Sequence, residues 1–357
     1  MRVKMVKIAL DGFGSFLGME RGCFVVRDKE GKARRYPLFE SEIGEVILRS
    51  GNTVSTGALA SLGFWDIDVL ILSNNGKPVA MVRSLNSDSH VRTRIAQYEA
   101  LNNGKGIHIA KQIVLKKLEG QNLVLKKYGL KQHDLISVKE RIESLLNDSK
   151  GTDQIEFDNL KALRRKLLPI EGNCSDLYFK QIVQLFPRNI VRTNNRRTFR
   201  AYDGLNNTFN LVYSLLKWKV HIALLKAKLE PFLGFLHSEE AGKPSLICDM
   251  VELYRYMADD FLIKHCQKFT SKDFVVKTEQ YIPNRRGMRE YLNDSMTNRL
   301  IRAFYGYLDW KVRIPRIRHG YRQSLETLIN EESLLFAKYL RNERETWIPR
   351  IALPFYY

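Results

Sequence analysis

The sequence contains few cysteines and no long apolar run. Its 357 residues include four cysteines, Cys23, Cys174, Cys248 and Cys266, and no Cys-x-x-Cys pair. This pattern excludes a disulfide scaffold, gives no support to a structural zinc site and predicts a reducing, cytoplasmic environment. Apolar runs end well before the roughly 18 residues that a membrane span needs. The first residues meet Asp11 early and lack a small-residue cleavage site, so we expect neither a signal peptide nor a membrane partner.

Acidic residues are scarce relative to basic ones. The chain has 39 Asp and Glu against 58 Lys and Arg, a formal net charge of +19. Its hydrophobic fraction of 44% is ordinary for a globular protein, which excludes a disordered chain. Proteins that neutralise phosphates need clustered basic side chains, so this charge suits nucleic-acid binding, and general solubility explains it equally well.

The hydrophobic pattern divides the chain into two parts. Up to about residue 85, short runs rich in Val, Ile and Phe alternate with turn signals and predict strands at 5–10, 23–27, 45–49, 69–73 and 79–82. One short helix interrupts them over 56–62, where Ser55 can act as N-cap. We therefore expect an α+β protein in which residues 1–85 form a small β-sandwich-like domain and residues 86–357 a larger all-α domain.

The second part has a helical period throughout. The predicted helices cover residues 90–101, 107–128, 134–146, 158–166, 169–186, 207–229, 245–269, 286–308 and 324–342.

Two runs in this part contain arginine and no acid. Mixed basic, Asn and aromatic composition is typical of a surface that contacts the phosphate backbone without reading bases, although a charge run can also be only a solvated face. The DNA-binding candidates are Arg188, Arg192, Arg196, Arg197, Arg200, Arg313, Arg316 and Arg318.

One group of polar residues could together bind a metal ion. His237 follows a Pro- and Gly-broken connection, and the helix after it carries Asp249 and Glu252 one turn apart, on one face. Glu171 lies in the first turn of another predicted helix. One imidazole and several carboxylates suit a divalent ion such as Mn²⁺ or Mg²⁺, which can polarise a phosphoryl oxygen. Each residue also has a simpler structural explanation, and spacing alone does not bring these helices together.

The order of motifs resembles the CRISPR-associated protein-one family, the integrase and nuclease of spacer acquisition. The most specific block runs from Gly-Phe-Leu-His at 234–237 through Gly-Lys-Pro-Ser-Leu at 242–246 to Asp249 and Glu252. The other matching pieces are Glu171-Gly172, Tyr178-Phe179, residues 203–207, Asn210, Tyr213, Pro231 and Arg255, with residues 22–26, 55–59, 63–69 and 94–98 in the first part.

The resemblance implies roles for these residues. Glu171, His237 and Glu252 would bind one Mn²⁺ or Mg²⁺ ion, and Asp249 would be an accessory acid that holds a metal-bound water or accepts a proton. The first domain would form a homodimer, and the expected protein partner is the small CRISPR-associated protein two. Two departures from the family are Cys174-Ser175-Asp176, where Ala and Arg are common, and Lys228, where glycine is usual.

We therefore expect a metal-dependent DNA endonuclease and integrase of antiviral CRISPR adaptation. It would act on double-stranded and branched DNA, with insertion of a short duplex at the repeat boundary by 3′-hydroxyl transesterification. The competing hypothesis is a non-catalytic, architectural nucleic-acid-binding protein with the same fold. RNA processing is a third reading, although the sequence has no aromatic ribonucleoprotein motif.

Overall fold

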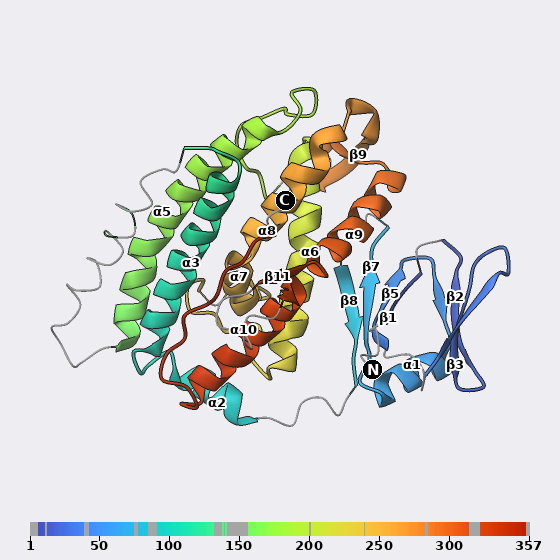
Figure 1. Cartoon of the computed structure of the whole chain (residues 1–357), viewed down its shortest axis with the longest axis horizontal. Coiled ribbons are helices and arrows are strands. Elements are labelled where there is room, and N and C mark those ends of the chain that lie inside the picture. The colour runs from blue at the N-terminus through green and yellow to red at the C-terminus, as the bar shows by residue number, and fades with distance from the viewer. Residues whose placement is uncertain are drawn as a thin grey trace. The chain divides into compact units, whose positions relative to one another are not determined.

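The chain separates into two compact units, residues 1–89 and 90–357, with the division four residues beyond the expected one. The structure is a computed structural model, and Figure 1 shows its elements. It describes residues 6–10, 13–38, 43–74, 78–84, 91–131, 138, 140, 156–199, 201–238, 240–282, 285–313 and 322–354.

The first unit contains two four-stranded sheets and one helix. Sheet one has the strand order β1-β5-β7-β8, in which β1, β5 and β7 are parallel and β8 is antiparallel to β7. Sheet two has the order β4-β3-β2-β6, antiparallel except for the β2–β6 pair. The elements are β1 (Val6–Ala9), β2 (Phe16–Glu20), β3 (Cys23–Arg27), β4 (Ala33–Pro37), β5 (Ile43–Arg49), β6 (Thr53–Val54), α1 (Thr56–Phe64), β7 (Asp68–Leu72) and β8 (Pro78–Val82).

A single core joins both sheets to α1. Phe24 of sheet two, Val46 and Val69 of sheet one, and Leu62 of α1 belong to one buried cluster. Ser55 caps α1 as expected, because its side chain accepts from the Ala58 amide at 3.2 Å. The β-sandwich-like description is therefore refined, since one sheet is largely parallel and a helix contributes to the core.

The second unit is helical, and the expected α+β class is confirmed. Its helices are α2 (Val91–Glu99), α3 (Lys105–Lys127), α5 (Glu156–Ile182), α6 (Gly204–Lys226), α7 (Ser245–Glu252), α8 (Arg255–His265), α9 (Asp294–Leu308) and α10 (Leu325–Leu340). Two antiparallel strand pairs, β9 (Phe274–Ile282) with β10 (Arg285–Leu292) and β11 (Lys311–Arg313) with β12 (Arg322–Ser324), correct the expectation of an all-α domain.

Several helix boundaries differ from the sequence prediction. Helix α5 runs through Pro169, so the two helices predicted around it are one. The helix predicted over 245–269 breaks after Glu252, and α8 starts at Arg255. Residues 286–292 are strand β10, because they pair with β9, and the helix starts only at Asp294. Most of the helix predicted at 134–146 lies outside the described residues.

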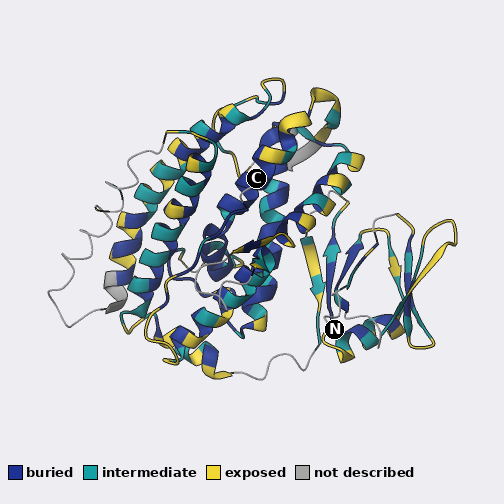
Figure 2. Ribbon diagram, in the orientation of Figure 1, coloured by how far each residue is buried: buried dark blue, intermediate teal, exposed yellow. Residues whose placement is uncertain are grey.

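Helix α6 forms the centre of the second unit. Figure 2 shows it dark blue along most of its length, and its buried residues include Phe209, Leu216 and Val220. It contacts α7, α8, α9 and α10. Helix α3 packs against both α5 and α8, and Gly120 permits the second contact because a Cβ there would meet the Tyr256 ring at 2.3 Å. This packing brings α3, α5 and α7 together around the predicted site.

Candidate metal centre

Asp249 fixes the turn that carries His237. Asp249 is fully buried on α7, and its Oδ2 accepts hydrogen bonds from the backbone amides of Phe235 at 2.5 Å and Leu236 at 2.9 Å. Its Oδ1 accepts from the His237 amide at 2.9 Å and contacts the His237 ring Nδ1 at 2.7 Å. A carboxylate offers about four lone-pair sites, and these four contacts use them all. Asp249 therefore holds and orients His237.

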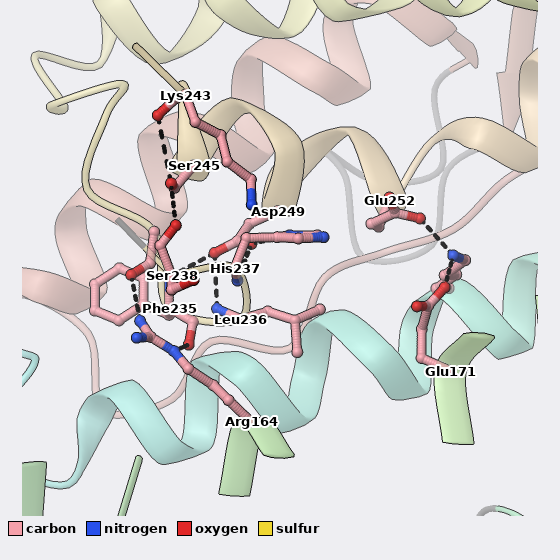
Figure 3. Close-up of polar contacts among 12 residues, drawn as sticks. Arg164, Glu171, Phe235, Leu236, His237, Ser238, Lys243, Ser245, Asp249 and Glu252 are labelled. Carbon is pink, nitrogen blue, oxygen red and sulfur yellow. Dashed lines mark hydrogen bonds and ion pairs between the residues drawn. The ribbon is translucent and has the colours of Figure 1, made fainter. Parts of the chain in front are cut away.

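The same turn is supported from its other side (Figure 3). Arg164 of α5 donates from Nε to the Phe235 carbonyl at 2.7 Å and from Nη2 to the Gly234 carbonyl at 2.8 Å. Gly234 is required by close packing, because a Cβ would lie 2.8 Å from the backbone of Ser245 and 2.9 Å from Asp249 Oδ2. The turn is thus held by α5 and α7 together.

The contact with Asp249 determines which ring nitrogen of His237 is available. A carboxylate only accepts, so Nδ1 carries a proton, and in the neutral imidazole the lone pair is then on Nε2. The His237 side chain is 23% exposed, and Figure 3 shows the ring extending from Asp249 toward the side on which Glu252 lies. Oriented in this way, an imidazole is prepared to bind a metal through Nε2.

Glu171 of α5 and Glu252 of α7 share one cation. Lys117 Nζ contacts Glu171 Oε1 and lies 2.6 Å from Glu252 Oε2. Arg255 Nη2 lies 3.0 Å from the other Glu252 oxygen, and Ser175 Oγ donates to Glu171 Oε1 at 2.9 Å. The side chains of Lys117 and Glu252 are only 5% and 4% exposed, so the two carboxylates meet at a buried positive charge.

Neighbouring cations keep Glu252 ionised. Burial alone would raise the pKa of this carboxyl, but the positive charges of Arg255 and Lys117 outweigh it and hold the pKa below its usual value. An ionised carboxylate is what a hard or borderline divalent ion requires.

The donor set fits such an ion, although it is not assembled around one. Among the residues that the structure describes, no three His, Cys, Asp or Glu side chains converge closely enough to hold a metal. Glu171, Glu252 and Nε2 of His237 nevertheless offer two carboxylates and one imidazole, and the carboxylates already bind a cation between them. Asp249 does not fit the expected role of proton acceptor, because its lone pairs are all in use.

The arginine candidates fall into different environments. Arg188, Arg192, Arg197 and Arg313 are exposed. Arg196 is turned inward: its Nη1 donates to Asn206 at 2.9 Å and its Nη2 to Asn210 at 2.7 Å. The Arg196 guanidinium therefore anchors this segment to α6, and its contact with DNA stays a prediction. Arg200, Arg316 and Arg318 lie outside the described residues.

Three residues of this site were not predicted from the sequence: Lys117, Ser175 and Arg164. Lys117 is one of 58 basic residues and lies far along the chain from both carboxylates, so no spacing rule points to it. Ser175 follows Glu171 by four positions, one helical turn, and this spacing is the one local signal that was available. Ser175 is also one of the residues at which this chain departs from the family pattern, and here its side chain binds Glu171.

A polar network continues from the site into the core. Arg255 stacks over the Tyr213 ring at 5.2 Å, and the Tyr213 hydroxyl donates to Asp259 at 2.5 Å. Tyr178 donates to the other Asp259 oxygen at 2.9 Å. Burial raises the pKa of Asp259 to about 6, against the opposing effect of these hydrogen bonds and of nearby arginines.

The family is decided by a match over most of the chain. Residues 8–296 match the model of the CRISPR associated protein Cas1 family. The chain belongs to the Cas1 family. A CRISPR-associated endonuclease Cas1 from Korarchaeum cryptofilum is 23% identical over 96% of this chain and 97% of its own length. A second, from Archaeoglobus fulgidus, is 28% identical over 95% and 97%.

Solved structures agree on the Cas1 fold. A Cas1 protein from Thermotoga maritima has a TM-score of 0.72 at 18% identity, over 94% of this chain and 97% of that one. A casposase bound to its integration product has a TM-score of 0.77 at 21% identity, over 96% and 92%. A Cas6-RT-Cas1–Cas2 complex has a TM-score of 0.71 at 17% identity, over 98% of this chain and 36% of that one.

Proposed function

We propose that this Cas1-family chain is a metal-dependent DNA endonuclease and integrase of CRISPR adaptation. It joins the 3′-hydroxyl of a short duplex to the repeat boundary by transesterification. The observation that carries the proposal is the meeting of Glu171 and Glu252 at one buried cation, beside an imidazole whose Nε2 is kept open. Relatives that are named endonucleases, and the structural likeness to a casposase bound to its integration product, support it.

Glu171, His237 and Glu252 would hold a Mn²⁺ or Mg²⁺ ion. Such an ion, when bound, neutralises charge that develops on a phosphoryl oxygen and lowers the pKa of an attacking hydroxyl. The chain's own contribution is orientation. Asp249 keeps the His237 ring in one tautomer, and Ser175 and Arg255 each bind one oxygen of the carboxylate ligands.

The exposed arginines supply the surface for double-stranded and branched DNA. Arg188, Arg192 and Arg197 precede α6, on a segment that Arg196 anchors. Phosphate contacts of this kind position a duplex without specifying its sequence. No described helix is long and apolar enough to cross a bilayer. The structural likeness to a complex containing Cas1 and Cas2 supports CRISPR-associated protein two as the protein partner.

Cleavage and strand joining test the proposal directly. Labelled branched and linear DNA is incubated with the protein in Mn²⁺, in Mg²⁺ and in EDTA. We expect products only with metal, and none from Glu171→Ala or Glu252→Ala. Glu119→Ala is the matched control, because it removes an exposed carboxylate from α3 and should leave activity unchanged. DNA binding without any metal-dependent product would overturn the proposal in favour of an architectural protein.

A homodimer built through the first unit is part of the same proposal. Phe64 and Trp65 are 79% and 46% exposed, and Val79 on the edge strand β8 is 62% exposed. Exposed apolar side chains beside an unpaired strand edge are a common self-association surface. We expect a dimeric mass in light scattering at micromolar concentration, reduced to the monomer by Val79→Lys with Phe64→Ser. A monomeric mass for the unmodified protein would contradict this part.

A further inference from the structure

Lys117 lies at the one position where the two carboxylates of the proposed metal centre meet. Its Nζ contacts Glu171 and is 2.6 Å from Glu252, and its side chain is 5% exposed. A buried ammonium is stable only when partners compensate the loss of hydration. Both carboxylate partners of this ammonium are proposed metal ligands.

We propose that Lys117 is a positioning residue that holds Glu171 and Glu252 together in the metal-free protein, and that a divalent ion must displace its ammonium to bind. The inference rests on the proposed function. An ammonium and a divalent ion cannot both occupy the gap between the same carboxylate oxygens, because two positive charges a few ångströms apart repel strongly in a buried site. Lys117 therefore lowers the metal affinity that the ligands alone would give.

The structure provides a second place for the displaced ammonium. Gln121 lies one turn further along α3, on the same face as Lys117. Its Oε1 is buried and has no hydrogen-bond partner among the described residues. Its Nε2 already faces Ser175 Oγ at 3.5 Å, so the amide presents Oε1 as the open acceptor. Rotation of the lysine side chain would give the ammonium a new partner and the amide its missing donor.

The arrangement also explains how the carboxylates are kept close without metal. A buried and a partly buried carboxylate side by side would repel one another, and each would need to be neutralised. Lys117 supplies the shared positive charge, and Arg255 supplies a second one that contacts Glu252. The protein can therefore fold with its ligands in place and take up the ion afterwards.

The test compares Lys117→Met with the unmodified protein by two measurements. The first is the Mn²⁺ dissociation constant from calorimetric titration without DNA. The second is the melting temperature in EDTA and in saturating Mn²⁺. Lys117→Met should bind Mn²⁺ at least about tenfold more tightly, the size of effect that residues around metal ligands exert. It should melt at a lower temperature in EDTA and gain more from Mn²⁺ than the unmodified protein does.

Lys116→Met is the matched control. It removes the neighbouring ammonium from α3, where Lys116 pairs with exposed Glu119. We expect its Mn²⁺ affinity and its response to Mn²⁺ to equal those of the unmodified protein. An equal rise in Mn²⁺ affinity in both lysine variants would show that the effect comes from the change in net charge, and would overturn the inference.

The remaining outcomes separate this inference from the proposed function. Mn²⁺ binding that Glu252→Gln abolishes but Lys117→Met leaves unchanged or weakens would overturn the role of Lys117 and leave the metal centre standing. No Mn²⁺ binding by any variant would overturn both.

Lys117→Arg covers the case in which the Met variant does not fold. It keeps the positive charge, and the planar guanidinium group of arginine binds two carboxylates more firmly than an ammonium does. It should therefore bind Mn²⁺ more weakly than the unmodified protein. Equal or tighter binding by Lys117→Arg would overturn the inference.

Discussion

The two halves of the candidate metal centre are built in different ways. The His237 half is held by backbone groups, since Asp249 accepts from three successive amides and Arg164 donates to two carbonyls of the same turn. The carboxylate half is held by long side chains, with Lys117 between Glu171 and Glu252. The first half has one geometry, whereas the second can adjust to the cation that it holds.

This difference assigns separate tasks to the two acids on α7. Asp249 and Glu252 lie three positions apart, as the sequence indicated, yet they bind different partners. Asp249 holds the turn in place, whereas Glu252 would bind the proposed ion once Lys117 is displaced. Removing each should therefore damage a different property, stability for Asp249 and metal binding for Glu252.

The largest effect should come from breaking the backbone-held half. Asp249→Ala leaves two buried amides, and the partly buried amide and ring nitrogen of His237, without their acceptor, at about 1–3 kcal/mol for each group that stays unsatisfied. We expect the free energy of unfolding to fall by about 3–5 kcal/mol in urea denaturation. Asp176→Ala is the control, because this residue forms an exposed ion pair with Lys180 and its loss should change stability by less than about 1 kcal/mol. Near-native stability of Asp249→Ala would show that the turn does not depend on this carboxylate.

The next largest effect is the pH dependence of stability that arises from Asp259, in the polar network next to Arg255. The pKa of Asp259 is raised from 3.8 to about 6, so the folded state binds its proton more tightly than the unfolded state. The contribution of the Asp259 carboxyl to the free energy of unfolding is therefore complete below about pH 4 and is lost as pH rises to about 6. At about 1.4 kcal/mol per unit of pKa shift, the change is about 3 kcal/mol.

Asp259→Asn isolates this contribution. The difference in unfolding free energy between the unmodified protein and Asp259→Asn should move in favour of the unmodified protein as pH falls from 7 to 4.5. Urea denaturation at the two pH values measures it. A difference that is independent of pH would place the pKa of Asp259 at its ordinary value.

The arginines before α6 also differ in role, since Arg196 is held by hydrogen bonds within the fold and Arg197 is exposed. Arg196→Ala should cost about 2 kcal/mol of stability, because it removes two charge-assisted hydrogen bonds to Asn206 and Asn210. Arg197→Ala removes an exposed side chain and should change stability by less than about 0.5 kcal/mol. It should instead lower the slope of DNA affinity against salt concentration by about one unit on a log–log plot. Equal stability of the two variants would show that Arg196 is not an anchor.

The smallest effect is expected at the end of α6. Lys228 has a φ of +61°, a left-handed conformation that is unfavourable for residues with a Cβ. Lys228→Gly should stabilise the fold by about 0.5–1 kcal/mol, after the greater entropy of glycine in the unfolded chain is deducted. Lys228→Ala keeps the Cβ and should give no such gain in thermal denaturation. This backbone strain explains physically why glycine is usual there in the family.

The parts of the fold that the sequence predicted correctly depend on local signals. The Ser55 cap identified α1, and the apolar run at 23–27 identified β3. Strand β4, Ala-Arg-Arg-Tyr-Pro, was missed because it is charged and largely exposed. Strand β10 was taken for helix because its conformation comes from pairing with β9, which lies outside any local window.

The candidate site divides in the same way. Helical spacing and the loop before α7 placed His237, Asp249 and Glu252 near one another. The sequence spacing could not show which of the two acids binds the turn, because the turn is bound through backbone amides, which every residue type except proline carries. Lys117 could not be found at all, since it reaches Glu171 and Glu252 only through the packing of α3 against α5 and α7.

The amide contacts of Asp249 also fix the length of the turn from Gly234 to His237. The amides of Phe235 and Leu236 share Oδ2 and the amide of His237 takes Oδ1, so one inserted or deleted residue would shift the later amides out of register and rotate the imidazole away. Beyond His237 the amide contacts to Asp249 end, and Ser245 Oγ donates to the Ser238 carbonyl at 2.8 Å. Glu240 to Lys243 form an exposed turn closed by a single 3.0 Å backbone hydrogen bond, with Gly242 in a left-handed conformation. We therefore expect that turn to tolerate changes in chain length better than residues 234–237 do, and a peptide tag inserted there to leave the histidine in place.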